Sequence, residues 1–408
     1  MPVDKTTFHR ASILVGVIVL IALAVVADFY VNLLHASNPF WDFRTYVVAM
    51  HAADKGLNPY SLEALKAIDP IVRFPFVYPP NIVWLFRDIL AWPYETVLRI
   101  YLVGLIIAFV AIYSLQSRLL FQRSERWIVA VALVATLGRV TFKAFLTGNI
   151  AILLYCGLVF GLWALVRGRA LYFYVAILIA SQFKFVFLMF LLVPLVLAPS
   201  DAFWPVSMVV VIYAMDTLAM RWANPSLFAN FLSSASAEFA HEFHDEHNGL
   251  FGLATYFTGN VFGISDIATS AVPIAAALYG MFVGTIILTM RHCVAKCRVA
   301  YTQPVPQEVL AYLWLSAALC FPRLGTYDLP TLILPVACLI KRAVWPSPGA
   351  LVVTSLMISG LVGLCFLVPG HFFSVYVRND PPYFLLIMFW ILASYHILSC
   401  YRLGKNMS

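Results

Sequence analysis

Charged side chains are scarce in this sequence: they make up 11% of its 408 residues, against roughly 25% in an average soluble protein. Hydrophobic residues make up 62%, and many uncharged stretches are about 20 residues long, enough to cross a bilayer. This composition excludes a soluble globular enzyme, a disordered regulator and a nucleic-acid-binding protein. The alternating strands of a membrane β-barrel are also missing. We therefore predict an all-α, polytopic integral membrane protein.

Several other patterns are absent. The seven cysteines show neither a disulfide framework nor the paired motifs of a zinc site. Internal repeats are missing, so an inverted-repeat transporter has no support. Phosphate-cradling loops and nucleophile elbows are missing too. We expect no cofactor.

Apolar runs define the predicted spans. The first run is about 22 residues long, which exceeds the 7–15-residue core of a signal peptide, so we predict a retained signal anchor. About twelve spans, or ten to twelve because several are short, are predicted at 12–34, 95–116, 127–146, 149–166, 170–182, 185–197, 203–220, 268–290, 308–321, 327–340, 349–368 and 382–400.

The 26 Lys and Arg exceed the 19 Asp and Glu, giving a net charge of +7. Membrane proteins collect such bases in short cytoplasmic loops. With the N-terminus inside, those loops contain Lys5, Arg10, Arg118, Arg123, Arg126, Arg167, Arg169, Arg291, Lys296, Arg298, Lys341, Arg342, Arg402 and Lys405. Both termini are therefore predicted to be cytoplasmic.

Two long loops, 35–94 and 221–267, fall on the opposite, external face. The first is rich in Trp, Tyr and Pro, which suits helices lying at the membrane interface. Long ordered loops are usually functional. We expect the chemistry on this face.

Asp42 lies just beyond the first predicted span, between Trp41 and Phe43. Apolar neighbours remove water from a carboxylate and favour a general base. The alternative is an ordinary helix N-cap. Arg44 would oppose the base role and could bind a phosphate instead.

External cations are the candidates for a phosphate site: Arg44, Arg73, Lys143, Lys184 and Arg323. Lys184 lies between two apolar runs, where a cation is expensive and therefore a functional candidate; snorkelling to the interface is the alternative. Residues 241–247 carry His241, His244 and His247 on one helix face. This pattern fits a solvated helix or a substrate-contacting loop better than a metal site.

Short motifs along the chain resemble glycosyltransferase family 87. In order, they are Asp42-(x)3-Tyr46, Gly56-Leu57-Asn58-Pro59-Tyr60, Phe76-Val77-Tyr78-Pro79-Pro80, Gly148-Asn149, Lys184, His247-Asn248-Gly249-Leu250 and Phe321-Pro322-Arg323-(x)3-Tyr327-Asp328. Many members have a His in the last loop, where this chain has Tyr327 and Asp328. Any role that this His has in the family therefore cannot be transferred to the present chain.

The resemblance implies a single transmembrane domain of the GT-C fold over residues 1–408, in a bacterial inner membrane with a periplasmic active site. It implies an inverting transfer of a sugar from a polyprenyl-phosphate donor to a glycan or glycolipid hydroxyl, with Asp42 as general base and mannose as the first expectation. The implied donor-phosphate contacts are Arg44, Lys184, His244, His247 and Arg323. The implied substrate contacts are Tyr46, Tyr60, Tyr78, Asn149, Asn248, Tyr327 and Asp328.

Three alternatives stay open at this point. The sugar could be arabinofuranose. The chain could instead be a lipid or sugar transporter, although a transporter keeps its polar groups at the bilayer midplane. It could also be an inert scaffold of a glycan-assembly complex.

Overall fold

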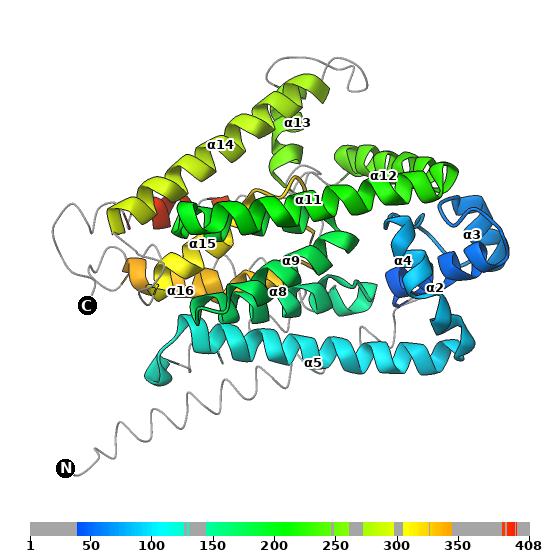
Figure 1. Ribbon diagram of the computed structural model, residues 1–408, viewed down its shortest axis with the longest axis horizontal. Helices are drawn as coiled ribbons and strands as arrows, with labels where there is room; N and C mark the ends of the chain where they lie inside the picture. The colour runs from blue at the N-terminus through cyan, green and yellow to red at the C-terminus, as the bar shows by residue number, and fades with distance from the viewer. Residues whose placement is uncertain are drawn as a thin grey trace, which may run out of the picture.

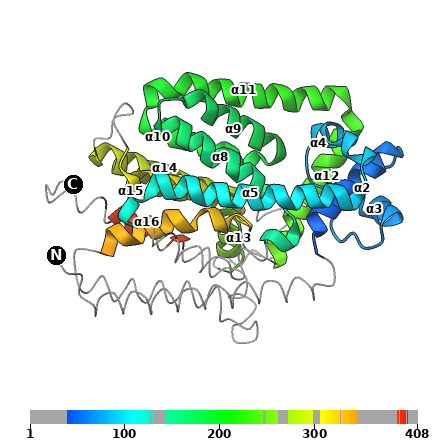
Figure 2. The ribbon, with the colours of Figure 1, turned by 90° about the horizontal axis from the view of Figure 1, so that it is seen from below.

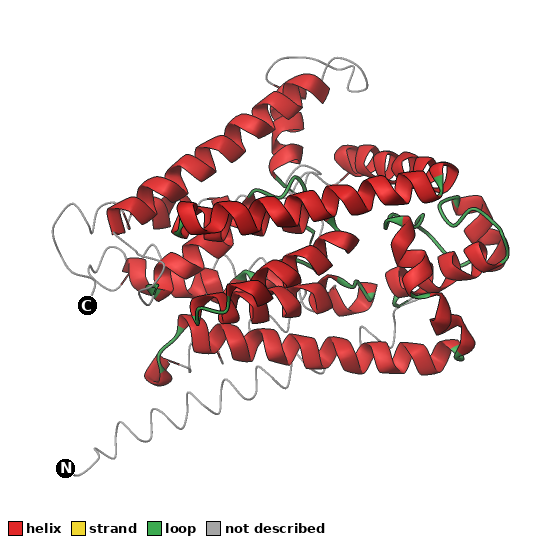
Figure 3. Cartoon of the chain, in the orientation of Figure 1, coloured by secondary structure: helices red, strands yellow, loops and turns green. Residues whose placement is uncertain are grey.

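The structure is a computed structural model that describes residues 39–125, 129, 144–245, 249–260, 272–297, 305–325, 327–344, 386–387, 390–395 and 397. Every regular element in this part of the chain is a helix (Figure 3). The predicted all-α class is confirmed for these residues. Predicted spans 12–34 and 349–368, and most of 127–146 and 382–400, lie outside them.

The helices follow the predicted apolar runs closely. In chain order they are α2 (Trp41–Asp54), α3 (Leu62–Ile68), α4 (Pro80–Leu85), η1 (Arg87–Ala91), α5 (Tyr94–Leu120), η2 (Arg123–Glu125), α8 (Ala151–Val166), α9 (Ala170–Phe183), η3 (Phe185–Leu191), α10 (Leu192–Leu197), α11 (Pro199–Ala223), α12 (Pro225–Asp245), α13 (Leu250–Asn260), α14 (Val272–Cys297), α15 (Gln307–Leu319), η5 (Leu329–Thr331) and α16 (Ile333–Val344).

Three of these helices are long and apolar enough to cross a membrane: Tyr94–Leu120, Pro199–Ala223 and Pro273–Lys296. The protein is therefore a membrane protein, but the described residues do not establish twelve spans. The reason is length. α9 has 14 residues and so rises about 21 Å, less than the roughly 30 Å of a bilayer core.

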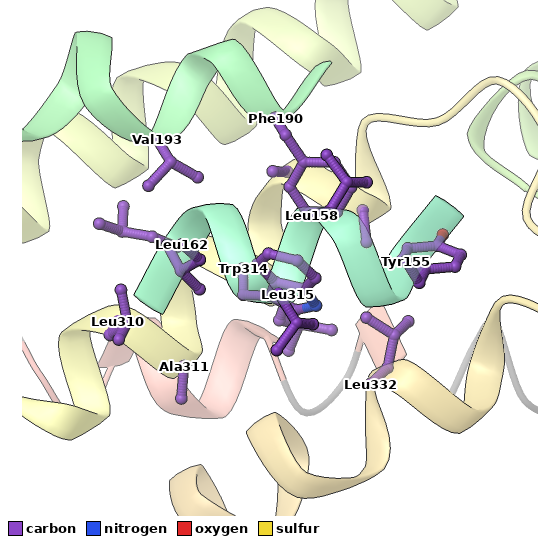
Figure 4. Packing of buried hydrophobic residues seen from close by; sticks show 14 of the residues in the cluster. Tyr155, Leu158, Leu162, Phe190, Val193, Leu310, Ala311, Trp314, Leu315 and Leu332 are labelled. Atoms are coloured by element: carbon purple, nitrogen blue, oxygen red, sulfur yellow. The ribbon is translucent and has the colours of Figure 1, made fainter. Parts of the chain in front are cut away.

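The main core lies between α5, α8, α10 and α15, and α15 is buried on every side. Figure 4 shows Leu158 and Leu162 of α8 gathered with Trp314 of α15 and Phe190 of η3. The Phe190 and Trp314 rings lie 4.4 Å apart. A helix that is apolar all round has to be buried in this way.

Residues 39–93 form a cap with a small core of its own, which includes Val48, Leu65 and Phe76. The cap packs on α12, whose Ser234 hydroxyl donates to the Phe76 carbonyl at 3.1 Å. In both ribbon views, α2, α3 and α4 cluster at one end of the bundle, around the first turns of α5 (Figures 1 and 2). The bases Arg118, Arg167 and Lys296 lie at the helix ends that point away from this cap.

The start of α2 is docked onto the turn that precedes α8. Phe40 has a left-handed backbone, with φ of 61°, and its N–H donates to the Leu146 carbonyl at 2.6 Å. Gly148 also has a positive φ, 65°. A Cβ added there would lie 3.1 Å from the Phe43 Cβ, so only glycine allows this approach without strain.

We expect Gly148→Ala to lower the free energy of unfolding by about 1–3 kcal/mol, because it adds both left-handed strain and a contact with Phe43. The matched control is Gly168→Ala. Gly168 has the same kind of backbone, with φ of 76°, but nothing within 4 Å of an added Cβ. Thermal unfolding of the purified protein should show the larger loss at Gly148. Equal losses would contradict close packing at this turn.

Candidate active site

Asp42 is the second residue of α2 and does not act as its N-cap. The cap position belongs to Phe40, and no side chain caps the helix. The Asp42 carboxylate instead points across to the turn before α8, where its Oδ2 accepts a hydrogen bond from Asn149 Nδ2 at 2.7 Å. The N-cap interpretation of Asp42 is therefore wrong, because the chain turns into the helix through Phe40.

Asn149 is 5% exposed, and its backbone N–H and both polar atoms of its side chain are hydrogen-bonded. Its backbone N–H donates to the Thr147 hydroxyl at 3.1 Å. Its Oδ1 accepts from the Ala151 N–H at 3.0 Å and from Lys184 Nζ at 3.2 Å. These donors fix the amide with its oxygen toward Lys184 and its nitrogen toward Asp42. One neutral side chain thus bridges an acid and a base.

Lys184 follows the last residue of α9, where the chain leaves the helix in an extended conformation. Its ammonium lies 4.2 Å from the centre of the Tyr327 ring, close enough for a cation–π contact. The loop behind that ring is tightly folded, because Asp328 Oδ2 accepts the Gly325 N–H at 2.7 Å. Asp328 is 5% exposed and therefore supports the loop that positions Tyr327.

Three cap tyrosines stand beside this bridge. The hydroxyls of Tyr46 and Tyr78 are hydrogen-bonded at 2.9 Å, and the Tyr60 hydroxyl donates to the Tyr78 carbonyl at 3.0 Å. Burial raises the pKa of Tyr78 to about 12, and nearby Asp42 acts in the same direction against the opposing charge of Lys184. The Tyr78 hydroxyl therefore keeps its proton at neutral pH.

The two predicted arginine contacts differ in their surroundings. Residues two apart on a helix point about 200° apart, so Arg44 faces away from Asp42, and it forms an ion pair with Asp69 at 3.5 Å. Arg323 lies in the loop after α15 that also carries Tyr327 and Asp328, and its positive charge acts on the buried Asp328 carboxylate, as that of Lys184 does.

The predicted contacts in the late external loop fall outside this description. His247 and Asn248 lie outside the described residues, and His244 belongs to α12 without a described side chain. Among the described residues, no three His, Cys, Asp or Glu side chains come together as a metal site would require. The absence of such a group does not extend to the 241–247 histidine pattern, whose side chains are not described.

A cavity of about 400 Å³ adjoins the bridge. Phe43 and Tyr46, one and four residues after Asp42 in α2, line it together with side chains from α4, η1 and the start of α5. Asp88 is the one charged residue of its lining. An apolar cavity beside a charged pair is the usual composition of a site for an amphiphilic ligand.

A comparison with known protein families decides the identity. The profile of glycosyltransferase family 87 matches residues 76–322. The chain belongs to glycosyltransferase family 87. It is therefore a membrane glycosyltransferase, and the resemblance drawn from its motifs is confirmed. No curated protein and no solved structure matches the chain significantly. Asn149 and Lys184 lie within the matched range, whereas Asp42 precedes it.

The structure adds one site residue that the sequence did not single out. Tyr101 of α5 stacks on Phe43 with the ring centres 4.6 Å apart, and its hydroxyl donates to the Gly148 carbonyl at 2.9 Å. It thereby holds the turn that carries Asn149. A tyrosine within an otherwise apolar span was the only available signal, and tyrosines are common near membrane interfaces.

We expect Asn149→Asp to reduce transferase activity at least tenfold at pH 7.5, because it replaces a charge-assisted hydrogen bond by two carboxylates in contact. As the pH falls, the two neighbouring carboxylates share one proton. This proton restores a hydrogen-bond donor between residue 149 and Asp42. The loss should therefore shrink toward pH 5. A pH–rate profile measures this.

Asn149→Leu is the matched control, because it removes the bridge without adding a titratable group. Its loss should be similar at every pH. If both variants show the same pH-independent loss, the contact between residue 149 and the Asp42 carboxylate does not matter to the reaction.

Proposed function

We propose that this glycosyltransferase moves one sugar, mannose first, from a polyprenyl-phosphate donor to a hydroxyl of a glycan or glycolipid. The observation that supports this is the Asp42–Asn149–Lys184 bridge. It presents one base and one cation on either side of a single amide, where the cap meets α8 and α9. The half-buried Asp42 and Lys184 both retain access to a ligand.

The chemistry follows from the two charges. Asp42 accepts the proton of the acceptor hydroxyl as its oxygen attacks the anomeric carbon. The bond to the donor phosphate breaks, and the Lys184 ammonium stabilises the departing phosphate. Both hydrogen bonds of the bridge keep Asp42 Oδ2 and Lys184 Nζ within about 8 Å. This proximity lets the base and the cation act on the same donor sugar. Single displacement inverts the anomeric carbon.

The apolar cavity supports a lipid-linked donor. Its lining includes Ile82, Phe183 and Ile100, and Ile100 is 61% exposed on α5, one of the helices long enough to span the membrane. A prenyl chain can enter from that side with its phosphate toward Lys184. Burying such a chain contributes about 0.8 kcal/mol per CH₂.

The placement of basic residues supports a periplasmic site. Arg118, Arg167 and Lys296 lie at the end of the bundle opposite the cap, and membrane proteins keep such bases in the cytoplasm. The cap then faces the periplasm of a bacterial inner membrane.

We expect Asp42→Asn to lower kcat by about 10²–10⁴-fold, the usual contribution of a general base. The assay combines the purified protein, a labelled polyprenyl-phosphate mannose and a membrane glycolipid extract. The amide keeps the size of the side chain, so thermal unfolding should change little.

Asp54→Asn is the matched control on the same helix. Asp54 is exposed and pairs with Arg87 at 2.6 Å, and an exposed pair contributes little to stability, so its loss should leave the rate unchanged. Unchanged transfer by Asp42→Asn would eliminate Asp42 as the base. No transfer from any polyprenyl-phosphate sugar by the native protein would eliminate the proposed donor.

We expect Ile100→Trp to raise KM for a long-chain polyprenyl donor about tenfold, because an indole at the cavity mouth displaces part of the chain. A two-isoprene donor should be affected less. Ile106→Trp is the control: it is exposed on α5 like Ile100 but does not line the cavity. Steady-state kinetics with the two donors would show an equal effect on both if the chain binds elsewhere.

A further inference from the structure

A second polar cluster joins α4 to α9 and α11, and none of its residues lines the apolar cavity. Asn81 of α4 donates through its Nδ2 to Gln182 Oε1 at 3.1 Å and to Asp216 Oδ2 at 3.3 Å. The three residues come from α4, α9 and α11, so three separate elements contribute to one group. Neither the bridge nor the proposed reaction uses them.

The cluster has unused hydrogen-bonding capacity. The Asn81 Oδ1 is buried and has no partner among the described residues. Asp216 has one carboxylate oxygen beyond that bonded to Asn81. Burying an acceptor without a donor costs about 1–3 kcal/mol. Asp216 itself lies in a membrane-spanning helix, where an ionisable residue is expensive and normally has a function.

The surroundings of Asp216 are open to the membrane. Ile212 and Ala219, about one turn before and after Asp216 on the same face of α11, are exposed, while Asp216 itself is partly exposed. It lies seven residues before the end of α11, about 10 Å along the helix axis, and this end of α11 faces the cap (Figures 1 and 2). A lipid headgroup can thus reach the cluster laterally.

The chemistry of the cluster selects the ligand. A phosphate is disfavoured, because the cluster contains a carboxylate and no cation. An ammonium group would pair with the free acceptors but would leave the Gln182 Nε2–H groups, which donate to no described residue, without an acceptor. A hydroxyl both donates and accepts, so several hydroxyls match the mixture of amide and carboxylate groups. Tyr213, one turn before Asp216 on the same face, adds an aromatic ring.

The cluster is also close to the reacting groups along the chain. Gln182 and Lys184 flank Phe183, which lines the apolar cavity and lies 5.9 Å from the Phe86 ring. Asn81 follows the Pro79-Pro80 pair that separates it from Tyr78. A headgroup at the cluster would therefore lie beside the bridge and apart from the donor's chain.

We infer that Asn81, Gln182 and Asp216 form a subsite for the hydroxyl-rich headgroup of the acceptor, a sugar or polyol carried by a membrane lipid. Its assignment to the acceptor rests on the proposed function. The binding of such a headgroup by the cluster does not depend on the proposed function.

Binding is tested with the full chain in lipid nanodiscs and radiolabelled octyl mannoside as the probe, with empty nanodiscs subtracted. The native protein should bind it saturably, and Asp216→Asn should weaken binding at least tenfold. Asn81→Ser, on a different element, should weaken it similarly. Asp201→Asn is the matched control, because Asp201 lies in the first turn of the same helix, at the other end, and should bind as the native protein does.

Two chain-matched probes separate the headgroup from its tail. Octylamine carries an ammonium group, and triethylene glycol monooctyl ether lacks an array of hydroxyls. Both should bind at least tenfold more weakly than octyl mannoside. Equal binding of either probe, no saturable mannoside binding, or unchanged binding by both cluster variants would overturn the inference.

Kinetics link the cluster to the reaction. Asp216→Asn should raise KM for the glycolipid acceptor at least tenfold and leave KM for the donor unchanged. If the native protein transfers no sugar, the proposed function fails, while the binding experiment still tests the cluster. If transfer proceeds and Asp216→Asn leaves the KM for the acceptor unchanged, the assignment of the cluster to the acceptor fails and the proposed function stands.

Discussion

The hydrogen-bonded bridge from Asp42 through Asn149 to Lys184 is the contact on which the site depends. It joins residues that are 107 and 35 positions apart in the chain. A direct ion pair would satisfy both charges and leave little for a substrate, since each would be committed to the other. A neutral amide holds them near each other and leaves Asp42 and Lys184 partly exposed. In the proposed reaction, proton transfer and phosphate binding would then take place at neighbouring points.

The bridge in turn depends on close backbone packing. The Phe40 N–H reaches the Leu146 carbonyl, and Gly148 permits the approach of Phe43. The Tyr101 hydroxyl holds the Gly148 carbonyl from a third element. Catalytic groups must keep their positions to within fractions of an ångström. Side chains on three elements and one glycine supply that rigidity here, in a cap that has its own small core.

The sequence predicted the helices well, because apolar runs and prolines mark where they begin and end. α5, α8 and α9 follow 95–116, 149–166 and 170–182 within a few residues. It also pointed to Asp42, Asn149 and Lys184, through family motifs. It did not reveal that Asn149 joins the other two, since a contact between residues far apart leaves no local pattern. The partner of Arg44, Asp69, escaped prediction for the same reason.

In the proposed function, the short helix α4 would let one site serve two amphiphilic substrates. The donor and the acceptor would each carry an apolar tail and a polar head. In a single groove the two substrates would therefore compete for the same position. α4 begins at Pro80, directly after Pro79, and prolines at this position fix the helix start. Ile82 faces the apolar cavity, whereas Asn81 faces Gln182 and Asp216. In the proposed function, adjacent residues of one rigid turn would thus separate the donor's chain from the acceptor's headgroup, and the two reacting heads would meet at the bridge.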